Sequence, residues 1–381
     1  MRLRDLIYCR VATAGLVVAL SGRAQPARAV VVDADGWIEG KLASMSLREK
    51  LGQMLMIDLK GQSMTPDVVA HLEAGEFGNV IFFEKNLVDE GQTQIFLSQL
   101  QTHAVVRSGV PMLTAVDQEG GQVDRLGNLT QMRLTRHSAR TLGDVYNFAP
   151  EKARRLVKDL TNDIAREMKR LGFNMNLAPV LDLTDDKKSY IYQRSYGSDP
   201  SAVSRITEDF TRAMAANGIV TTGKHFPNLS GTRVDSHRAL PVLDRPLRDL
   251  ERYEFVPFHN LKDSLGAVMV GHVIVPDIDP VYPASVSPKA IRVLREQVGF
   301  KGVIVSDDIK MKALSSRYPL YEIVLRAVFA DVDMLIIAWD KDKQLEAIRV
   351  LEHAAQTGRL TMARIDQSVR RILALKYRYA R

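Results

Sequence analysis

The 381-residue chain is predicted to fold as an α/β protein, a single-domain TIM-type (β/α)8 barrel. Eight short apolar segments recur along it, stretches of helical character separate them, and ionisable residues stand where several segments end. Short, nearly continuous apolar runs are typical of strands buried on both faces, as in a parallel sheet. Eight such strands that alternate with helices favour a barrel.

The predicted strands follow one another from residue 51 to residue 340. They are "LGQMLMIDL" (51–59), "GNVIFFEKN" (78–86), "VPMLTAVDQEGG" (110–121), "FNMNLAPVLDL" (173–183), "IVTTGKHFP" (219–227), "AVMVGHVIV" (267–275), "GVIVSDD" (302–308) and "DMLIIAWD" (333–340).

Two of the intervening stretches show a clear helical period. From Pro150 the apolar positions are spaced three or four residues apart, at Leu156, Leu160, Ile164, Met168 and Leu171, and Gly172 suits the C-terminal end. A second stripe, at Leu345, Ile348, Leu351 and Ala355, stops before Gly358. The alternative of a doubly wound open sheet is less favoured, because no G-x-G-x-x-G turn follows the first strand.

The first 29 residues have the pattern of a secretory signal peptide. Arg2, Arg4 and Arg10 form a basic segment before a ten-residue apolar run (11–20), and Ala27-Arg28-Ala29 is a small-x-small cleavage site. The run is too short to span a bilayer, so we expect an exported protein, periplasmic or secreted, with no stable membrane insertion after cleavage. The catalytic domain would then comprise residues 30–381.

Removal of this segment changes what the composition implies. Five arginines and one aspartate would leave with it, which lowers the formal net charge by four, from +7 to +3. Basicity is therefore poor support for nucleic-acid binding, and no nucleic-acid partner is expected. Cys9, the only cysteine, would be removed as well, so the mature chain could form no disulfide.

Ionisable residues stand at the C-terminal ends of four predicted strands, namely Asp117, His225, His272 and Asp307. These ends meet on one face of a barrel, where barrel enzymes build their active sites. Three histidines (225, 237 and 272) could bind zinc with nearby aspartates, but no His-x-His or His-x-x-x-His pair is present. Glycoside hydrolysis suits the carboxylates better, since it needs one carboxylate beside the reacting carbon and one proton donor. No metal or other cofactor is expected.

An ordered set of motifs resembles glycoside hydrolase family 3, in particular its single-domain β-N-acetylhexosaminidase branch, typified by muropeptide-recycling β-N-acetylglucosaminidases. The motifs are "AVDQEGGQVDRL" (115–126), "NMNLAPVLDL" (174–183), "QRSYG" (193–197), "GKHFP" (223–227), "DSH" (235–237), "GHVIVPDIDP" (271–280), "PASVSP" (283–288) and "GFKGVIVSDDIKM" (299–311).

The resemblance implies a role for each matching residue. Asp307 corresponds to the nucleophile, His237 to the general acid/base and Asp235 to its partner. A carboxylate beside an imidazole keeps it oriented for proton transfer near neutral pH. The residues implied to bind the terminal sugar are Asp117, Arg125, Arg194, Lys224 and His225.

The chain departs from the family pattern at two places. Asn228-Leu229-Ser230 replaces the usual Gly-His-Gly, and Gln122 stands where arginine is usual. Loss of the glycines should alter the flexibility of this loop or the shape of the leaving-group subsite. Export is also unlike the best-known recycling enzymes, which are cytoplasmic.

The sequence thus predicts a monomeric, exported, retaining exo-β-N-acetylglucosaminidase whose partner is a carbohydrate substrate containing β-linked N-acetylglucosamine. Three alternatives stay open: an exo-enzyme of the same family that prefers glucose or xylose, a sugar-binding barrel with weakened catalysis, and a metal-dependent barrel hydrolase.

Overall fold

The computed structural model describes residues 33–129, 137–232, 239–338 and 340–380. One compact unit, Ala34–Arg381, contains all of the secondary structure given below. The predicted signal peptide (1–29) lies outside the described residues, so its boundary stays a prediction. No described helix combines the length and the apolar character needed to cross a membrane.

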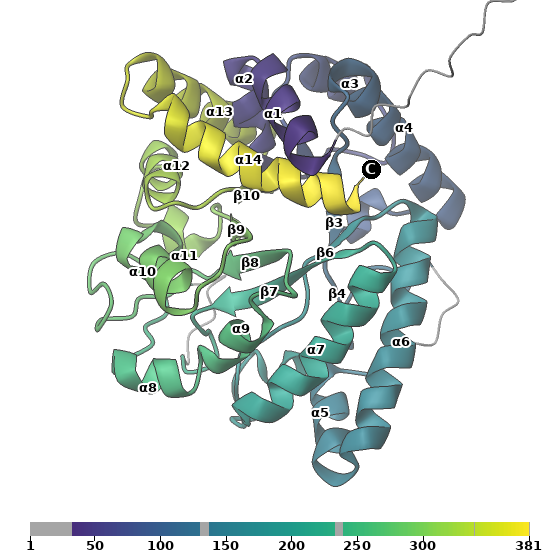
Figure 1. The fold of residues 1–381 in the computed structure, drawn as a ribbon, viewed down its shortest axis with the longest axis vertical. Coiled ribbons are helices and arrows are strands. Elements are labelled where there is room, and N and C mark those ends of the chain that lie inside the picture. Colours follow the sequence, from purple (N-terminus) through teal and green to yellow (C-terminus); the bar gives the residue numbers. More distant parts are fainter. Residues whose placement is uncertain (1–32, 130–136, 233–238, 339, 381) are drawn as a thin grey trace, which may run out of the picture. The chain divides into compact units, whose positions relative to one another are not determined.

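Eight parallel strands form the central sheet, as predicted (Figure 1). In spatial order they are β10 (Leu335–Ile337), β1 (Leu55–Ile57), β2 (Asn79–Phe82), β3 (Leu113–Val116), β6 (Met175–Asn176), β7 (Val220–Phe226), β8 (Ala267–Val270) and β9 (Val303–Ser306). A parallel bridge between Val305 and Met334 joins β9 to the start of β10 and brings the two edges of the sheet together. The (β/α)8 barrel is therefore confirmed.

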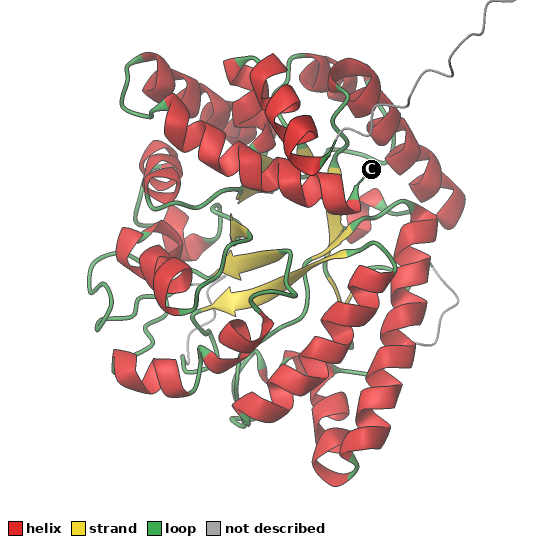
Figure 2. Ribbon diagram, viewed as in Figure 1, coloured by secondary structure: helices red, strands yellow, loops and turns green. Residues whose placement is uncertain are grey.

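Helices surround these strands (Figure 2). They are α1 (Ala34–Ser44), α2 (Leu47–Gln53), α3 (Pro66–Glu73), α4 (Glu90–Ser108), α5 (Ala139–Phe148), α6 (Pro150–Leu171), α7 (Pro200–Ala216), α8 (Leu247–Arg252), α9 (Val256–Leu261), α10 (Pro288–Arg292), α11 (Lys312–Ser315), α12 (Leu320–Phe329), α13 (Lys341–Gln356) and α14 (Met362–Tyr379). Helix α6 has the predicted bounds, because Pro150 occupies its first turn and Gly172 ends it with a φ of 102°.

The strands are shorter than the apolar runs that predicted them. The run 110–121 divides into β3 and a small hairpin, β4 (Gln118–Gly120) with β5 (Val123–Asp124), whose turn uses the positive φ of Gly120 and Gly121. The run 173–183 forms only β6 before it reaches Pro179, which has no N–H to donate to a ladder. Residues 177–183 after β6 stay buried, because this loop continues the core, whereas buried and half-buried residues alternate over 117–121 after β3.

Candidate active site

A cavity of about 240 Å3 lies at the C-terminal ends of the strands, and it brings together six of the eight predicted site residues. They are Asp117 after β3, Arg125 after β5, Arg194 in the 3-10 turn Tyr192–Arg194, Lys224 and His225 in β7, and Asp307 after β9. The other two, Asp235 and His237, lie outside the described residues, so their roles stay predictions.

Four charged side chains on one side of this cavity form a cluster that we call the Lys224 cluster: Asp117, Glu119, Arg194 and Lys224. The Lys224 Nζ atom lies 2.7 Å from Asp117 Oδ1 and 2.6 Å from Glu119 Oε1. Arg194 donates through Nε and Nη2 to the two oxygens of Glu119, each at 2.8 Å. Glu119 therefore holds both cations at the edge of the cavity.

Burial and charge oppose each other in this cluster. Burial alone would lower the pKa of the Lys224 ammonium, but Asp117 and Glu119 outweigh burial and raise that pKa above its ordinary value. Burial would also raise the pKa of Glu119, yet Arg194 and Lys224 keep it well below its usual range. Lys224 and Glu119 therefore both stay charged at neutral pH, so the cavity has a fixed hydrogen-bond donor and a fixed acceptor.

His225 is held by a carboxylate behind the cavity wall. Its Nδ1 atom lies 2.7 Å from Asp182 Oδ2, and its backbone N–H donates to the same oxygen at 3.1 Å. The other oxygen of Asp182 accepts the backbone N–H of Leu229 at 2.6 Å. Because an ionised carboxylate only accepts hydrogen bonds, Nδ1 carries the ring hydrogen and the orientation of the imidazole is fixed.

Asp307 follows β9, and hydrogen bonds hold the backbone around it in place. Its Oδ1 atom accepts the N–H of Asp308 at 2.8 Å. Asp308 Oδ1 in turn accepts the N–H groups of Lys310 at 3.1 Å and Ala338 at 3.3 Å, which ties the loop after β9 to the end of β10. Burial and the nearby charge of Asp307 raise the pKa of Asp308 to about 7.

His272, the fourth strand-end residue, does not line the cavity. It is fully buried, its Nε2 donates to the backbone carbonyl of Asp308 at 2.9 Å, and its Nδ1 lies 2.7 Å from Ser285 Oγ. A side chain at a strand end can point into the core as readily as into the cavity, since alternate residues face opposite ways. His272 thus supports the backbone beside Asp307 instead of facing the cavity.

Comparison with known proteins identifies this barrel. Residues 46–375 match the family model described as the glycosyl hydrolase family 3 N terminal domain. The chain belongs to glycosyl hydrolase family 3. The match spans every strand of the barrel and all eight of the predicted site positions, and the protein is a glycosidase.

Its relatives share the fold along most of their length. A "Beta-hexosaminidase" of Nitrosomonas eutropha is 32% identical over 83% of this chain and 90% of its own, and "Beta-hexosaminidase LpqI" of Mycobacterium tuberculosis is 33% identical over 88% and 84%. The solved family 3 β-N-acetylglucosaminidase of Paenibacillus sp. str. FPU-7 is similar at a TM-score of 0.83, with 33% identity over 88% of this chain and 63% of that one. LpqI of M. tuberculosis gives a TM-score of 0.78, with 31% identity over 89% and 96%.

Three carboxylates of this family 3 site escaped the sequence reasoning: Glu119, Asp182 and Asp308. Each lies inside one of the motifs given above and near the C-terminal end of a predicted strand, as Asp117 and Asp307 do. The sequence pattern does not show their partners, because Glu119 meets Lys224 and Arg194 only when β4, β7 and the 3-10 turn are brought together. Position at a strand end was the available signal.

The Asn228-Leu229-Ser230 segment is a buried, hydrogen-bonded turn. Asn228 Oδ1 accepts both the N–H and the hydroxyl of Ser230, each at 2.8 Å, and Thr232 Oγ1 donates to the Leu229 carbonyl at 2.9 Å. Leu229 is buried and lines the cavity. Side-chain hydrogen bonds therefore fix this turn, and Leu229 forms part of the cavity wall. The effect of the substitution on loop flexibility or on the leaving-group subsite stays a prediction.

A metal site was the competing interpretation of the histidines. Within the ranges that the structure describes, no three His, Cys, Asp or Glu side chains are grouped so that they could hold a metal ion. His225 is bound to Asp182 and His272 to Ser285 and Asp308, so each imidazole already has a defined contact.

Proposed function

We propose that this glycosidase is an exported, monomeric, retaining exo-β-N-acetylglucosaminidase that removes terminal β-linked N-acetylglucosamine from peptidoglycan fragments or chito-oligosaccharides. The observation that carries the proposal is the cavity in which the Asp307 carboxylate faces the Lys224 cluster and His225. The choice of sugar is supported by the relatives named for hexosaminidase and β-N-acetylglucosaminidase activity.

In the first step, the Asp307 carboxylate attacks the anomeric carbon and the bond from that carbon to the leaving oxygen breaks. His237, oriented by Asp235, gives its proton to the leaving oxygen. The product is a covalent glycosyl-enzyme, as retaining glycosidases form. The hydrogen bond from the Asp308 N–H and the support by His272 keep the nucleophile in place for this attack.

In the second step, water attacks the same carbon, His237 takes its proton, and the bond to Asp307 breaks. The Lys224 cluster and His225 bind sugar hydroxyls throughout. Because their positions are fixed by ion pairs before substrate arrives, they can stabilise the transition state without reorganisation.

Hydrolysis of aryl glycosides tests the proposal directly. We expect the wild-type protein to release nitrophenol from the aryl β-N-acetylglucosaminide, and Asp307→Ala to lose roughly 10³-fold or more in kcat with little change in unfolding temperature. Trapping with a fluorinated sugar, followed by mass spectrometry of the peptides, should place the label on Asp307. A label on any other residue would refute the assignment of the nucleophile.

The alternatives give different results in the same assay. Hydrolysis of only the glucoside or xyloside would reject the N-acetyl assignment. Calorimetric binding of N-acetylglucosamine without any turnover would favour a sugar-binding barrel, which the altered turn at Asn228-Leu229-Ser230 makes worth testing. Activity that is lost with a chelator and restored by zinc would support a metal-dependent hydrolase.

Export and the monomeric state are tested separately. The basic and apolar pattern of residues 1–29 supports cleavage after Ala29. Mass spectrometry of protein recovered from the extracytoplasmic fraction should show a mature N-terminus at Val30. Recovery of the intact chain from the cytoplasm would reject export, and light scattering at the mass of a dimer would reject the monomer.

A further inference from the structure

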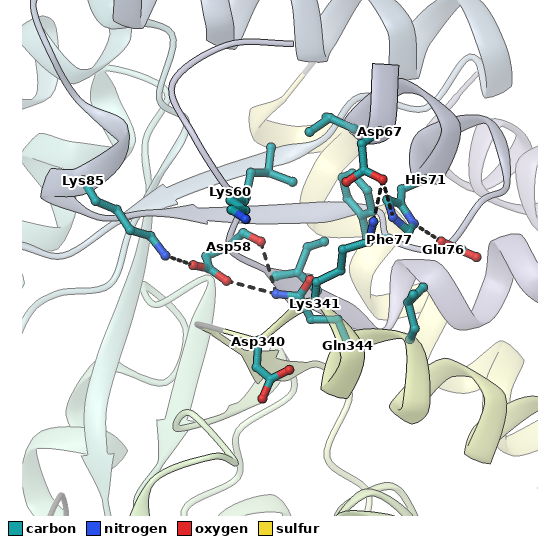
Figure 3. Close-up of a pocket in the computed structure, with 14 residues that line it drawn as sticks. Asp58, Lys60, Asp67, His71, Glu76, Phe77, Lys85, Asp340, Lys341 and Gln344 are labelled. Atoms are coloured by element: carbon teal, nitrogen blue, oxygen red, sulfur yellow. Dashed lines mark hydrogen bonds and ion pairs between the residues drawn. The ribbon is translucent and has the colours of Figure 1, made fainter. Parts of the chain in front are cut away.

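We propose that a second cavity, beside the catalytic one, binds the peptide of a peptidoglycan fragment while its sugar occupies the catalytic cavity. This inference rests on the proposed function. The second cavity has a volume of about 390 Å3 and is lined by residues from the end of β1, from α3 and from the start of α13 (Figure 3). It is larger than the catalytic cavity and contains none of the predicted site residues.

Two structural links join the second cavity to the catalytic one. The 3-10 turn η1 (Glu84–Asn86) contacts both: Glu84 binds Arg125 of the catalytic cavity at 2.8 Å, and the adjacent Lys85 forms an ion pair with Asp58 of the second. On another side, Asp340 of the second cavity lies 3.1 Å from Lys310, in the loop that begins with the nucleophile. A substrate held by its terminal sugar can therefore extend across this wall.

The charges of the second cavity select for a ligand that carries both signs. Four carboxylates and three ammonium groups line it, together with His71, above apolar side chains such as Ile57, Leu59 and Val68. A phosphate or other simple anion would meet more carboxylates than ammonium groups, so the cavity is a poor anion site despite the helix start beside it. Peptidoglycan stem peptides have free carboxylates, a free ammonium group and methyl or methylene groups between them, which matches this lining.

One ion pair at the rim is suited to exchange its partner for a ligand. Lys341 binds Asp67, and these side chains are 44% and 58% exposed (Figure 3). Exposed ion pairs contribute little to stability, because water screens them, so a bound peptide can replace this contact at little cost. Asp58, in contrast, is buried and held by Lys85 and by Gln344 Nε2 at 2.9 Å. The cavity thus has a fixed base and an exchangeable rim.

The test compares three substrates: the aryl β-N-acetylglucosaminide, a peptidoglycan disaccharide without peptide, and the same disaccharide with its stem peptide. The variant exchanges the rim pair, Asp67→Lys with Lys341→Asp, which preserves the ion pair and the net charge but reverses its direction. We expect kcat/KM to fall about tenfold for the peptide-bearing substrate, the effect of losing one charge-assisted contact, and to stay unchanged for the other two. Lys343→Ala, on the same helix but outside the cavity, is the matched control.

If the exchanged variant keeps the wild-type kcat/KM for the peptide-bearing substrate, the proposal is overturned. An equal loss on all three substrates would overturn it as well, because it would mark the pair as structural. If the wild-type protein hydrolyses none of them, the proposed function fails and the cavity is tested by calorimetry with the free stem peptide. Binding that is lost in the exchanged variant supports the peptide site, and the absence of binding to the wild-type protein overturns it.

Discussion

The two ends of the barrel each contain a buried cluster of acidic and basic side chains, and the clusters serve different purposes. At the C-terminal ends of the strands, the Lys224 cluster lines the catalytic cavity. Near the N-terminal ends of β9 and β10 lies what we call the Asp333 cluster: Arg295, Asp331, Asp333, Arg364 and Arg371. Residue type alone does not distinguish the two.

The two clusters differ in whether their carboxylate oxygens are already fully occupied by hydrogen bonds within the protein. Asp333 Oδ1 accepts from Ser368 Oγ at 2.6 Å and Arg371 at 2.8 Å, while Oδ2 accepts from Arg295 at 2.6 Å and the Ile304 N–H at 2.9 Å. These bonds join β9, the start of β10 and α14 and leave no face of the carboxylate for a ligand. In the Lys224 cluster, Asp117 borders a cavity. The functional cluster is therefore identified by a carboxylate that a ligand can reach at the C-terminal ends of the strands, more than by its ion pairs.

The largest effect should come from breaking the saturated cluster. We expect Asp333→Asn to lower the free energy of unfolding by about 3–5 kcal/mol, because it removes the fully buried one of the two carboxylates that the arginines share and breaks its hydrogen bonds. The kcat/KM of the folded protein should not change. Denaturant unfolding and the aryl-glycoside assay measure the two quantities.

Asp331→Asn provides the matched control for that change. Its side chain is 27% exposed, and its backbone has a φ of 77°, which asparagine tolerates well. We expect a loss of only about 1 kcal/mol, as for more exposed pairs. Equal losses in the two variants would show that saturation does not decide the stability contribution.

Breaking the cavity-side cluster should have the second-largest effect, on activity. Glu119→Gln leaves Lys224 and Arg194 without their shared charge, so both donors move from their positions beside the sugar. We expect kcat/KM to fall roughly 10²-fold, the typical result of misplacing binding groups by about 1 Å. The stability loss should be smaller than for Asp333→Asn, since water in the cavity can solvate the cations.

Glu84→Gln is the control, because its exposed pair with Arg125, another residue that lines the cavity, should matter little to stability. The comparison between the two ends fails if Glu119→Gln destabilises the protein as strongly as Asp333→Asn while its kcat/KM stays intact. The Lys224 cluster would then be structural as well.

Apolar runs predicted the fold well because each run maps onto one buried strand. All eight strands, their parallel order and the bounds of α6 followed from runs, spacing and end residues. Strand ends were less predictable, since the loop residues beyond β6 are as buried as the strand itself. Burial on both faces erases the alternation that would mark where pairing stops.

Site residues could be predicted from the sequence where a place at a strand end was enough to identify them. They were missed where their role depends on a contact with a distant side chain. Asp117, His225 and Asp307 stand at strand ends and line the cavity, whereas His272 stands at a strand end and faces the core. The roles of Glu119 and Asp182 depend on ion pairs with side chains that are far away in the sequence. Arg125, Arg194 and Lys224 were assigned through the family resemblance, and the six described residues do share one cavity.

Lys376 offers the smallest and most specific test, because it places a buried charge near the N-terminal ends of the strands with uncharged partners. Its Nζ atom donates to Gln53 Oε1 at 2.6 Å and to the Gly78 carbonyl at 2.8 Å. Burial lowers the pKa of Lys376 to about 7. The pKa of a lysine in the unfolded chain is about 10.4.

Between these two values the unfolded chain binds more protons than the folded protein, so the contribution of Lys376 to stability rises with pH. Below about 7 both states are protonated and the contribution is constant. The rise can reach about 1.4 kcal/mol per pH unit. We expect the difference in unfolding free energy between wild type and Lys376→Met to change by at most about 1.4 kcal/mol per pH unit, or roughly 2 kcal/mol from pH 7 to 9, as measured by denaturant unfolding. Lys376→Arg keeps the charge throughout, so it should lose the same slope and be less stable than Lys376→Met at pH 7. If the unfolding free energy of both variants rises with pH as steeply as that of the wild type, the titrating group is not Lys376. The contrast between this lysine, which has no charged partner among its hydrogen bonds, and the cations of the Asp333 cluster, which all have carboxylate partners, would then fail.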